Sequence, residues 1–254
     1  MQLLFEHASV TDSTNAELAR RIASGALHAP FCLSADEQTA GRGRRGRSWL
    51  NTEGALMMSL CVPLDGIACE LWPLLGFSAA LGVHSAVSGF LCNTFVKWPN
   101  DVVVIKNGGQ RKLCGILSEL VQDPSGAPYA VIGIGLNVNC ASVPDGLMQP
   151  ATSLSIELGY ELDIGALRSR IAYGVFGEIA KTEADAAALI LRFCERCSTL
   201  GRRVTARALS GEVICEGEAV RIASDGTLII KTEAGERSVA AADVSIRDPG
   251  AGNG

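Results

Sequence analysis

Histidines are scarce in this sequence, and so are the signals of membrane insertion and secretion. Only three histidines occur among 254 residues, in dissimilar contexts, which leaves little material for a histidine-based triad or metal cluster. No run of about 18 or more apolar residues occurs, which argues against a membrane span. The N-terminus lacks the basic and apolar regions of a secretory signal. We therefore expect a cytoplasmic protein without a membrane partner.

The cysteines also lack the order of a disulfide framework or a zinc site. Their number, nine, is odd, and without a secretory signal they are predicted to be reduced thiols. Cys194 and Cys197 have C-x-x-C spacing, but no second pair stands at a suitable distance for zinc. They lie late in a helical pattern instead of opening a helix after a strand, so we interpret them as half-buried thiols.

The common phosphate-binding motifs are missing as well. No G-x-x-x-x-G-K-[ST] sequence occurs, and "GIGLNV" has Val138 where a dinucleotide fingerprint requires its third glycine. The net charge of -5 and the pI near 5.3 argue against a general nucleic-acid binder, which would carry a basic field over a whole face. Any positive cluster is therefore local and points to one particular anion.

The hydrophobic pattern predicts an α+β domain followed by a small all-β domain. Strands and helices mix with hairpin signals, which is typical of a largely antiparallel sheet. After Leu200, β-branched runs separated by "SGE", "SDG" and "EAG" predict a barrel or sandwich of about 50 residues. We place domains at 1–198 and 199–248, with a tail at 249–254. The expected strands include 2–10, 31–37 and 55–63, and the expected helices are 12–25, 70–90, 163–181 and 184–198.

One basic stretch stands out in this acidic chain, "TAGRGRRGRSWL" at residues 39–50. It holds Arg42, Arg44, Arg45 and Arg47 together with three glycines. Glycine backbone amides can converge on a phosphate, and arginines can bind it with two parallel hydrogen bonds. From composition alone, a solvated turn or an arginine-rich RNA contact stays open beside anion binding.

Three further stretches have chemical potential. In "KWPND", Pro99 ends a strand and presents Asn100 and Asp101, which could help hold Mg²⁺, orient a basic side chain or merely form a polar turn. In "RKLCGIL", Lys112 follows a tight turn, and Gly115 permits close approach of a ligand. In "DSTN", a helix start gathers hydroxyls, an amide and the positive end of the helix dipole, although plain capping is the favoured explanation when the stretch is taken alone.

Taken together, these stretches resemble the biotin–protein ligase family. "DSTN", "EQTAGRGRRGRSW", "VKWPND", "KLCGILSE" and "GIGLNVN" occur in the family's order. The match is dense over residues 10–140 and continues to about residue 247. The resemblance implies a catalytic domain like that of class II aminoacyl-tRNA synthetases, with an SH3-like C-terminal domain. It further implies that biotin and ATP, with Mg²⁺, form biotinyl-5′-AMP, whose acyl group passes to a lysine of a biotin carboxyl carrier domain.

The resemblance also implies roles for individual residues. Arg44 and Lys112 are the expected catalytic residues, and no dedicated protein site for the metal is expected, since Mg²⁺ arrives with ATP. Asn100 and Asp101 are candidates for nucleotide or metal binding. The residues expected to bind biotin or the adenylate are Ser13, Thr14, Asn15, Gln38, Gly41, Arg42, Gly43, Arg44, Trp49, Lys112, Gly115, Gly133, Leu136 and Asn137.

The resemblance has departures and rivals. The family's repressors carry a winged helix-turn-helix before the Ser-Thr-Asn stretch, which here begins at residue 13, so we expect no binding to operator DNA. Residues 140–154 offer no distinctive match. Family members are monomers or dimers, so a homodimer stays open. A lipoate or octanoate ligase of the same fold is the alternative, and an arginine-loop nucleic-acid binder is the alternative of another class.

Overall fold

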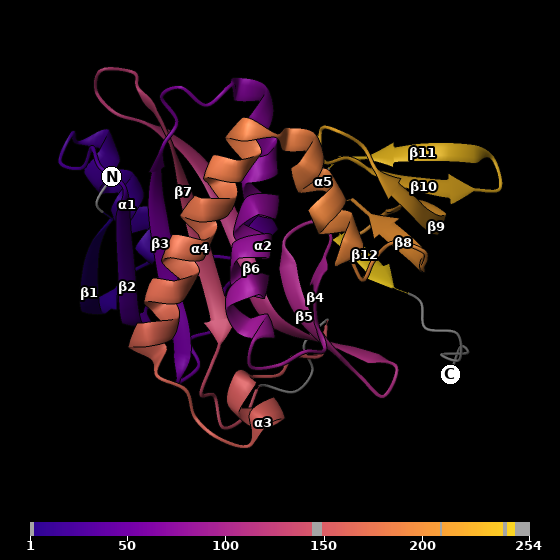
Figure 1. Cartoon of the computed structure of the whole chain (residues 1–254), viewed down its shortest axis with the longest axis horizontal. Helices are drawn as coiled ribbons and strands as arrows, with labels where there is room; N and C mark the ends of the chain where they lie inside the picture. Colours follow the sequence, from indigo (N-terminus) through magenta and orange to yellow (C-terminus); the bar gives the residue numbers. More distant parts are fainter. Residues whose placement is uncertain (1–2, 144–148, 209, 241–242, 247–254) are drawn as a thin grey trace.

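The computed structural model of the protein describes residues 3–143, 149–208, 210–240 and 243–246. Two sheets dominate it (Figure 1). The larger sheet has the strand order β1-β2-β3-β7-β6-β5-β4. Its strands are β1 (Leu4–Thr11), β2 (Phe31–Gln38), β3 (Ala55–Pro63), β4 (Thr94–Lys97), β5 (Asp101–Lys106), β6 (Gly109–Gln122) and β7 (Pro128–Asn137).

Most neighbours in the larger sheet are antiparallel, as predicted, while β1 and β2 run parallel. The β5–β6 hairpin turns at Asn107 and Gly108, both with positive φ, which is the conformation that an Asn-Gly pair favours. The apolar run of β3 lies in the middle of the sheet and is buried on both faces. The continuous hydrophobic pattern of this strand therefore reflects its central position.

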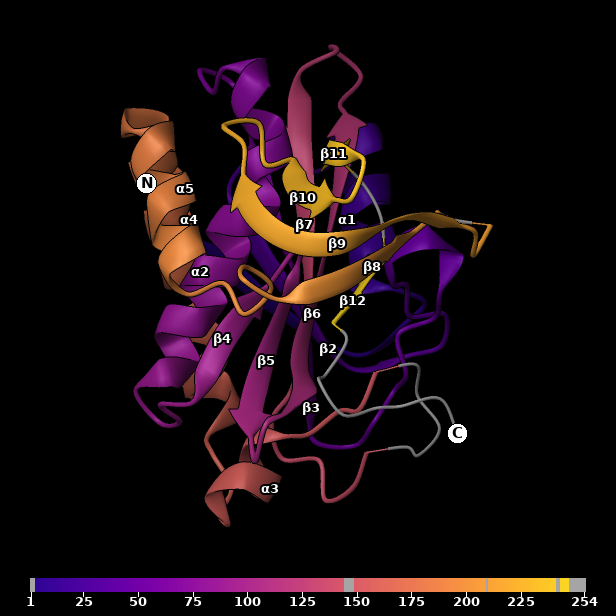
Figure 2. The same ribbon diagram turned by 90° about the vertical axis from the view of Figure 1, so that its right-hand side faces the viewer.

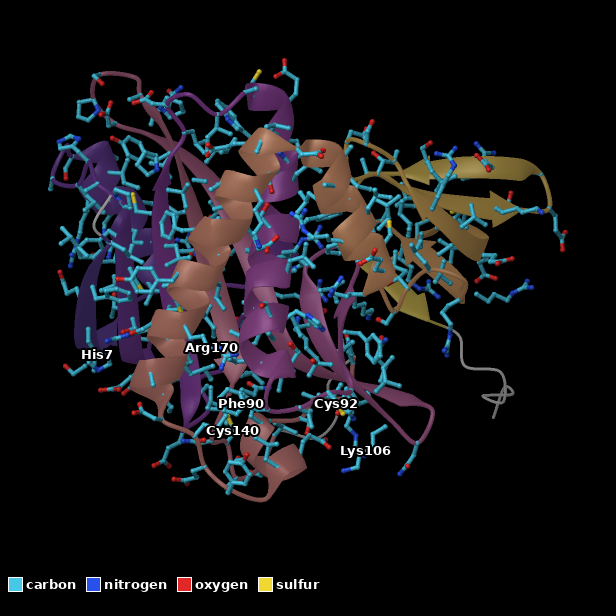
Figure 3. All side chains as sticks on the ribbon, in the orientation of Figure 1. His7, Phe90, Cys92, Lys106, Cys140 and Arg170 are labelled. Atoms are coloured by element: carbon cyan, nitrogen blue, oxygen red, sulfur yellow. The ribbon has the colours of Figure 1, made fainter. Side chains whose placement is uncertain are left out.

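Helices cover both faces of this sheet, as Figure 2 shows from the side. One face carries α2 (Leu75–Ser88) and α4 (Ile164–Ala184), followed by α5 (Ala186–Glu195), and the other carries α1 (Thr14–Ala23). At the crossing of α2 and α4, a Cβ on Gly82 would overlap the backbone of Val175, so glycine permits the close contact. Below it, the Arg170 guanidinium lies 5.4 Å from the ring centre of Phe90 (Figure 3).

The stretch Cys69–Ser88 is long and apolar enough to cross a membrane by length and composition alone. In the structure, 67% of its most apolar window is buried inside the molecule. Residues such as Ala79, Ala80 and Val83 are fully buried in the main core. The apolar character of this stretch is therefore explained by its place between the sheet and α4.

The smaller sheet is entirely antiparallel and has the order β11-β10-β9-β8-β12. Its strands are β8 (Arg203–Arg207), β9 (Val213–Ile222), β10 (Leu228–Thr232), β11 (Gly235–Val239) and β12 (Asp243–Ile246). The smaller sheet contacts the turn between β4 and β5 of the larger sheet, where Trp98 Nε1 donates to the Gly226 carbonyl at 2.9 Å. The two sheets share one hydrophobic core, and the boundary at residues 198/199 stays a prediction.

The predicted fold class is confirmed, with differences in detail. The predicted helix 70–90 begins as a 3₁₀ turn, Cys69–Leu74, which contains Pro73, and becomes α-helical only at Leu75. A short helix that the sequence pattern did not predict, α3 (Leu154–Leu158), begins at the last residue of the region 140–154, which offered no match. Residues 144–148 of that region and the predicted tail 249–254 lie outside the described residues. Cys194 and Cys197 are half-buried free thiols.

Candidate active site

A cavity of about 800 Å³ opens on the face of the larger sheet that carries α1. Its walls come from the start of α1, the Arg/Gly loop, the turn between β4 and β5, and the strands β6 and β7. Residues of the second domain, among them Arg202, Arg207 and Ser245, also line it. The five stretches on which the resemblance rests therefore meet in one place.

The closed end of the cavity is polar because α1 begins there. Ser13 has extended backbone dihedrals and caps the helix by accepting from the Ala16 N–H. The Thr14 N–H donates to Gln38 Oε1 at 2.7 Å, across the gap between α1 and β2. Ser13, Thr14 and Asn15 are each less than 5% exposed. This end of the cavity can form hydrogen bonds with a polar ligand head that is withdrawn from water.

Two residues that the sequence analysis missed support this end. The Ser59 hydroxyl on β3 lies 2.7 Å from Thr14 Oγ1 and 2.6 Å from Asn15 Oδ1. The Glu119 carboxylate on β6 accepts from Asn15 Nδ2 at 2.7 Å. The available signal was small: Ser59 is the lone hydroxyl in the apolar run "ALMMSLCVP", and Glu119 is an acidic residue inside a strand. Their partners come from distant segments, so spacing along the chain does not reveal them.

The Arg/Gly loop forms a small hairpin in the structure. An antiparallel bridge pairs Arg42 with Ser48, and a 3₁₀ turn spans Arg44–Gly46. The turn is closed by the Gly43 N–H, which donates to the Arg47 carbonyl at 2.7 Å. Gly46 has a φ of +72°, a left-handed conformation that glycine adopts without strain. The loop therefore has a defined path along the mouth of the cavity.

Two cations reach the middle of the cavity, and the "WPND" turn binds both. Arg44 donates to Asn100 Oδ1 at 2.8 Å. Lys112 Nζ lies 2.8 Å from Asp101 Oδ1, with the lysine side chain 28% exposed. Asn100 is itself fixed, since its Nδ2 donates to the Ile116 carbonyl. Each partner holds a positive charge where a ligand in the cavity can meet it.

Trp49 forms an apolar wall between the polar end of the cavity and the two cations. Its ring lies 5.7 Å from Lys112 Nζ, a cation–π distance. A Cβ on Gly135 would overlap the indole, and a Cβ on Gly115 would come within 2.9 Å of it. Gly133 makes room in the same way for Asn15. The glycines of β6 and β7 are therefore needed because side chains from other elements occupy their face of the sheet.

The outer part of the cavity is built by residues after β7. The segment around Ala151 runs beside β6, where the Lys112 N–H donates to the Pro150 carbonyl at 2.7 Å. Asn137 Nδ2 donates to the Thr152 carbonyl and fixes the end of β7 against the same segment. Buried Lys97 donates to Gln149 Oε1 at 3.0 Å. Gln149, Pro150 and Ala151 thereby join the cavity wall.

Two predicted site residues lie elsewhere. Leu136 is fully buried in the hydrophobic core and does not line the cavity. Side chains alternate along a strand, so Gly133, Gly135 and Asn137 face the cavity while Leu136 faces away from it. Placing Leu136 in the cavity wall was therefore wrong. Gly41 lies beside the cavity instead of in its wall, and its carbonyl accepts from the Trp49 N–H at 3.0 Å.

No nucleophile–base pair emerges at this site among the described residues. Cys114, the thiol closest in sequence to Lys112, is fully buried, and burial raises its pKa above the ordinary thiol range. A thiol in that state is a poor nucleophile. His7 lies on β1 at the far edge of the sheet, away from the cavity (Figure 3). The arrangement instead suits binding of an anion by fixed cations and amides.

Comparisons with known proteins show the family to which the chain belongs. The profile of the biotin/lipoate A/B protein ligase family matches residues 7–139, and that of the biotin protein ligase C-terminal domain matches residues 199–247. The chain belongs to this ligase family. It is 35% identical over 240 residues to the biotin–[acetyl-CoA-carboxylase] ligase of Mycobacterium tuberculosis, covering 92% of this chain and 85% of that one.

Other members of the family are similar over comparable lengths. The biotin–[acetyl-CoA-carboxylase] ligase of Paracoccus denitrificans is 34% identical, covering 92% of this chain and 97% of that one. The bifunctional ligase/repressor BirA of Bacillus subtilis is 32% identical, with 94% and 71% covered. The biotin protein ligase of Aquifex aeolicus, solved in complex with biotin and ATP, superimposes with a TM-score of 0.79 at 26% identity, covering 96% and 98%.

Proposed function

We propose that this family member is a biotin–[acetyl-CoA-carboxylase] ligase. It activates biotin with ATP to biotinyl-5′-AMP and transfers the biotinyl group to a lysine of a biotin carboxyl carrier domain. The observation that carries the proposal is the single cavity in which a buried polar end, an indole wall and two fixed cations follow one another. Relatives that cover most of the chain bear that name.

Biotin fits the order of groups in the cavity. Its polar ureido ring would enter the end formed by Ser13, Thr14 and Gln38, where donors and acceptors are withdrawn from water. Its valeryl chain would lie along Trp49 and Gly115. That path brings the carboxylate to Lys112, whose ammonium is held by Asp101. The ligand is thus bound at one end and reacts at the other.

The reaction needs two anions to meet, so the fixed cations are its main requirement. A carboxylate oxygen of biotin attacks the α-phosphorus of ATP, and the bond to pyrophosphate breaks. Lys112 and Arg44 stabilise the negative charge on the oxygens around that phosphorus. In the second step, the neutral amine of the carrier lysine attacks the acyl carbon, AMP leaves with the bonding electron pair, and the amine nitrogen loses a proton.

Magnesium would enter with the triphosphate and neutralise part of its charge. Among the described residues, no group of three or more His, Cys, Asp or Glu side chains gathers to hold a metal ion. Asn100 and Asp101 direct their oxygens to Arg44 and Lys112. We therefore favour positioning of the two cations as their role, while direct contact with nucleotide or metal stays a prediction.

We further propose that the protein acts in the cytoplasm on a carrier domain, with its catalytic domain at residues 1–198 and its C-terminal domain at 199–248. The absence of a repressor function likewise stays a prediction. A lipoate or octanoate ligase shares the family, so acyl specificity is the point to test. A nucleic-acid-binding role is disfavoured because Arg44 faces a ligand-sized cavity and bonds with Asn100.

Transfer to a carrier domain tests the proposal. The purified protein is incubated with ATP, Mg²⁺ and biotin, and with the biotinyl domain of an acetyl-CoA carboxylase as acceptor. We expect the acceptor mass to rise by one biotinyl group, and an acceptor whose target lysine is replaced by Arg to stay unmodified. Lipoate and octanoate serve as competing acids. Modification by lipoate or octanoate in preference to biotin would reject the proposal.

A further inference from the structure

A chain of polar groups lies behind the wall of the cavity. Ser59 is completely buried and does not line the cavity. Its hydroxyl oxygen lies 2.6 Å from Asn15 Oδ1 and 2.7 Å from Thr14 Oγ1. Glu119 extends the chain by accepting from Asn15 Nδ2 at 2.7 Å. Ser59 can therefore act on a ligand only through its neighbours.

The number of hydrogens decides the direction of these bonds. A carboxylate only accepts, so Asn15 must direct its NH₂ group toward Glu119 and its oxygen toward Ser59. An amide oxygen cannot donate, so the single hydroxyl hydrogen of Ser59 goes to Asn15 Oδ1. The short contact between Ser59 and Thr14 then needs the hydrogen of Thr14.

The Thr14 hydroxyl is left with lone pairs and no hydrogen for the cavity. The Thr14 oxygen also lies 3.1 Å from Gln38 Oε1. Thr14 has a single hydroxyl hydrogen, however, and the shorter contact, to Ser59, already takes it. Gln38 Oε1 accepts from the Thr14 N–H, so it too has only lone pairs to offer. Thr14 and Gln38 both line the cavity, so its polar end offers two acceptor oxygens that lie 3.1 Å apart.

We propose that Ser59 is a positioning residue: held by Asn15 and Glu119, it keeps the Thr14 hydroxyl as an acceptor, so that this end selects a ligand head presenting N–H groups. The inference rests on the proposed function for the identity of the ligand, whose ureido ring carries two N–H donors. A dithiolane or an alkyl end has none and would leave both oxygens desolvated without a partner.

The same chain reaches the Arg/Gly loop. Glu119 Oε1 lies 3.9 Å from an Arg42 Nη1 atom, while its other oxygen accepts from Asn15. One carboxylate therefore contacts both the loop at the cavity mouth and the buried chain behind the cavity. Glu119 is partly exposed, so its ion pair with Arg42 adds little stability. The pair nevertheless holds the Arg42 and Glu119 side chains next to each other.

Replacing Ser59 by Ala tests the role of its hydroxyl. Without Ser59 as acceptor, the Thr14 hydrogen turns to Gln38 Oε1, which withdraws an acceptor from the ligand. We expect the dissociation constant of biotin, measured by titration calorimetry, to rise about tenfold. The KM of ATP in pyrophosphate exchange should stay within about twofold of the wild type, because the change acts at the biotin end only.

A matched variant and a double-mutant cycle separate positioning from stability. Ser78→Ala removes another completely buried hydroxyl, which lies 2.9 Å from Thr182 far from the cavity, and should leave biotin binding unchanged. Thr14→Val should weaken binding directly. Adding Ser59→Ala to Thr14→Val should then change the dissociation constant by no more than about twofold, since Ser59 acts through Thr14. If Ser59→Ala does not fold, Ser59→Cys carries the same expectation, because a thiol is a poor hydrogen-bond partner.

Each result has a stated meaning. Wild-type affinity in Ser59→Ala, effects that multiply in the double variant, or a parallel rise in the KM of ATP would overturn the positioning role. Failure of the wild-type protein to bind biotin would instead reject the proposed function together with this inference. The positioning role would also be overturned if Ser59→Ala bound biotin more weakly but still discriminated against lipoate as strongly as the wild type. The chain of polar groups behind the cavity is proposed to set that preference.

Discussion

At the residue scale, the site depends on two cations that side chains of the turn between β4 and β5 hold in place. Asn100 and Asp101 follow one another in the turn between β4 and β5, and each bonds with a different cation. Asp101 begins β5 opposite Gly115, and Lys112 lies three residues before Gly115 on β6. The register of one hairpin thus brings the carboxylate to the ammonium, and no cost of reorienting the lysine remains at the moment of reaction.

Lys112→Met tests the ammonium at this site. The substitution keeps an unbranched side chain and removes the charge, and it leaves Asp101 without its partner. We expect biotin-dependent adenylate formation to slow by about 10²-fold or more, the scale of losing one preorganised charge contact. Single-turnover measurement of pyrophosphate release checks this, with the exposed Lys231→Met as the control. An unchanged rate would remove Lys112 from the chemistry.

At the scale of elements, the cavity wall is built by a loop side chain that packs on the glycines of two strands. The hairpin of the Arg/Gly loop brings Trp49 over β6 and β7, where the glycines stand. The indole nitrogen of Trp49 is buried without a hydrogen-bond partner among the described atoms. Such a donor is costly to leave unpaired, so a ligand acceptor beside it would be favoured.

Gly135→Ala tests the packing of Trp49. The added methyl group would overlap the indole, so Trp49 must leave its place and the loop must shift with it. We expect faster tryptic cleavage within the loop and at least about tenfold weaker biotin binding. Gly177→Ala is the control, because a methyl group there meets open space. Equal cleavage rates in both variants would show that the indole does not hold the loop.

Glu157→Gln tests how the short helix α3 is anchored. The side chain is 1% exposed and bonds with Lys106 and Thr152. Burial alone would raise the pKa of Glu157, but the hydrogen bonds from Lys106 and Thr152 and the charges of Lys106 and Arg111 outweigh it and hold the pKa below its usual 4.5.

A carboxyl whose pKa is lowered by folding contributes stability above its unfolded pKa, and this contribution is lost as the pH falls through the folded value. We expect Glu157→Gln to lower the free energy of unfolding by about 1–3 kcal/mol at pH 7. The difference from wild type should shrink once the pH falls below about 4.5. Urea unfolding at pH 7 and pH 4 measures it, and a difference that is the same at both pH values would contradict the ionic anchor.

The parts that could be predicted from sequence are those with local causes. The helix start within "DSTN", the turn at Asn107-Gly108 and the apolar run of β3 each follow from neighbouring residues, and the structure has them. The parts that could not be predicted join the site only because distant segments of the chain pair. They are Ser59, Glu119 and the segment beside Lys112. Leu136 was misplaced because the motif fixed its position along β7 but not the face of the strand.

At the scale of the whole molecule, the two sheets act as one frame for the cavity. Trp98, next to the "PND" turn, is almost fully buried and donates to Gly226 of the second domain. The Trp98 N–H donates to Thr199 Oγ1 at 3.1 Å, at the start of that domain. Arg202 and Ser245 of the second domain line the same cavity. The second domain is therefore placed to take part in binding as well as in folding.

Biotin-dependent exchange of labelled pyrophosphate into ATP tests the central claim most directly, because it reports the first chemical step without a carrier protein. The wild-type protein should exchange label only when biotin is present, and octanoate or lipoate in its place should give rates near background. Exchange that proceeds without biotin, or that is faster with lipoate than with biotin, would contradict the assignment of this cavity to biotin activation.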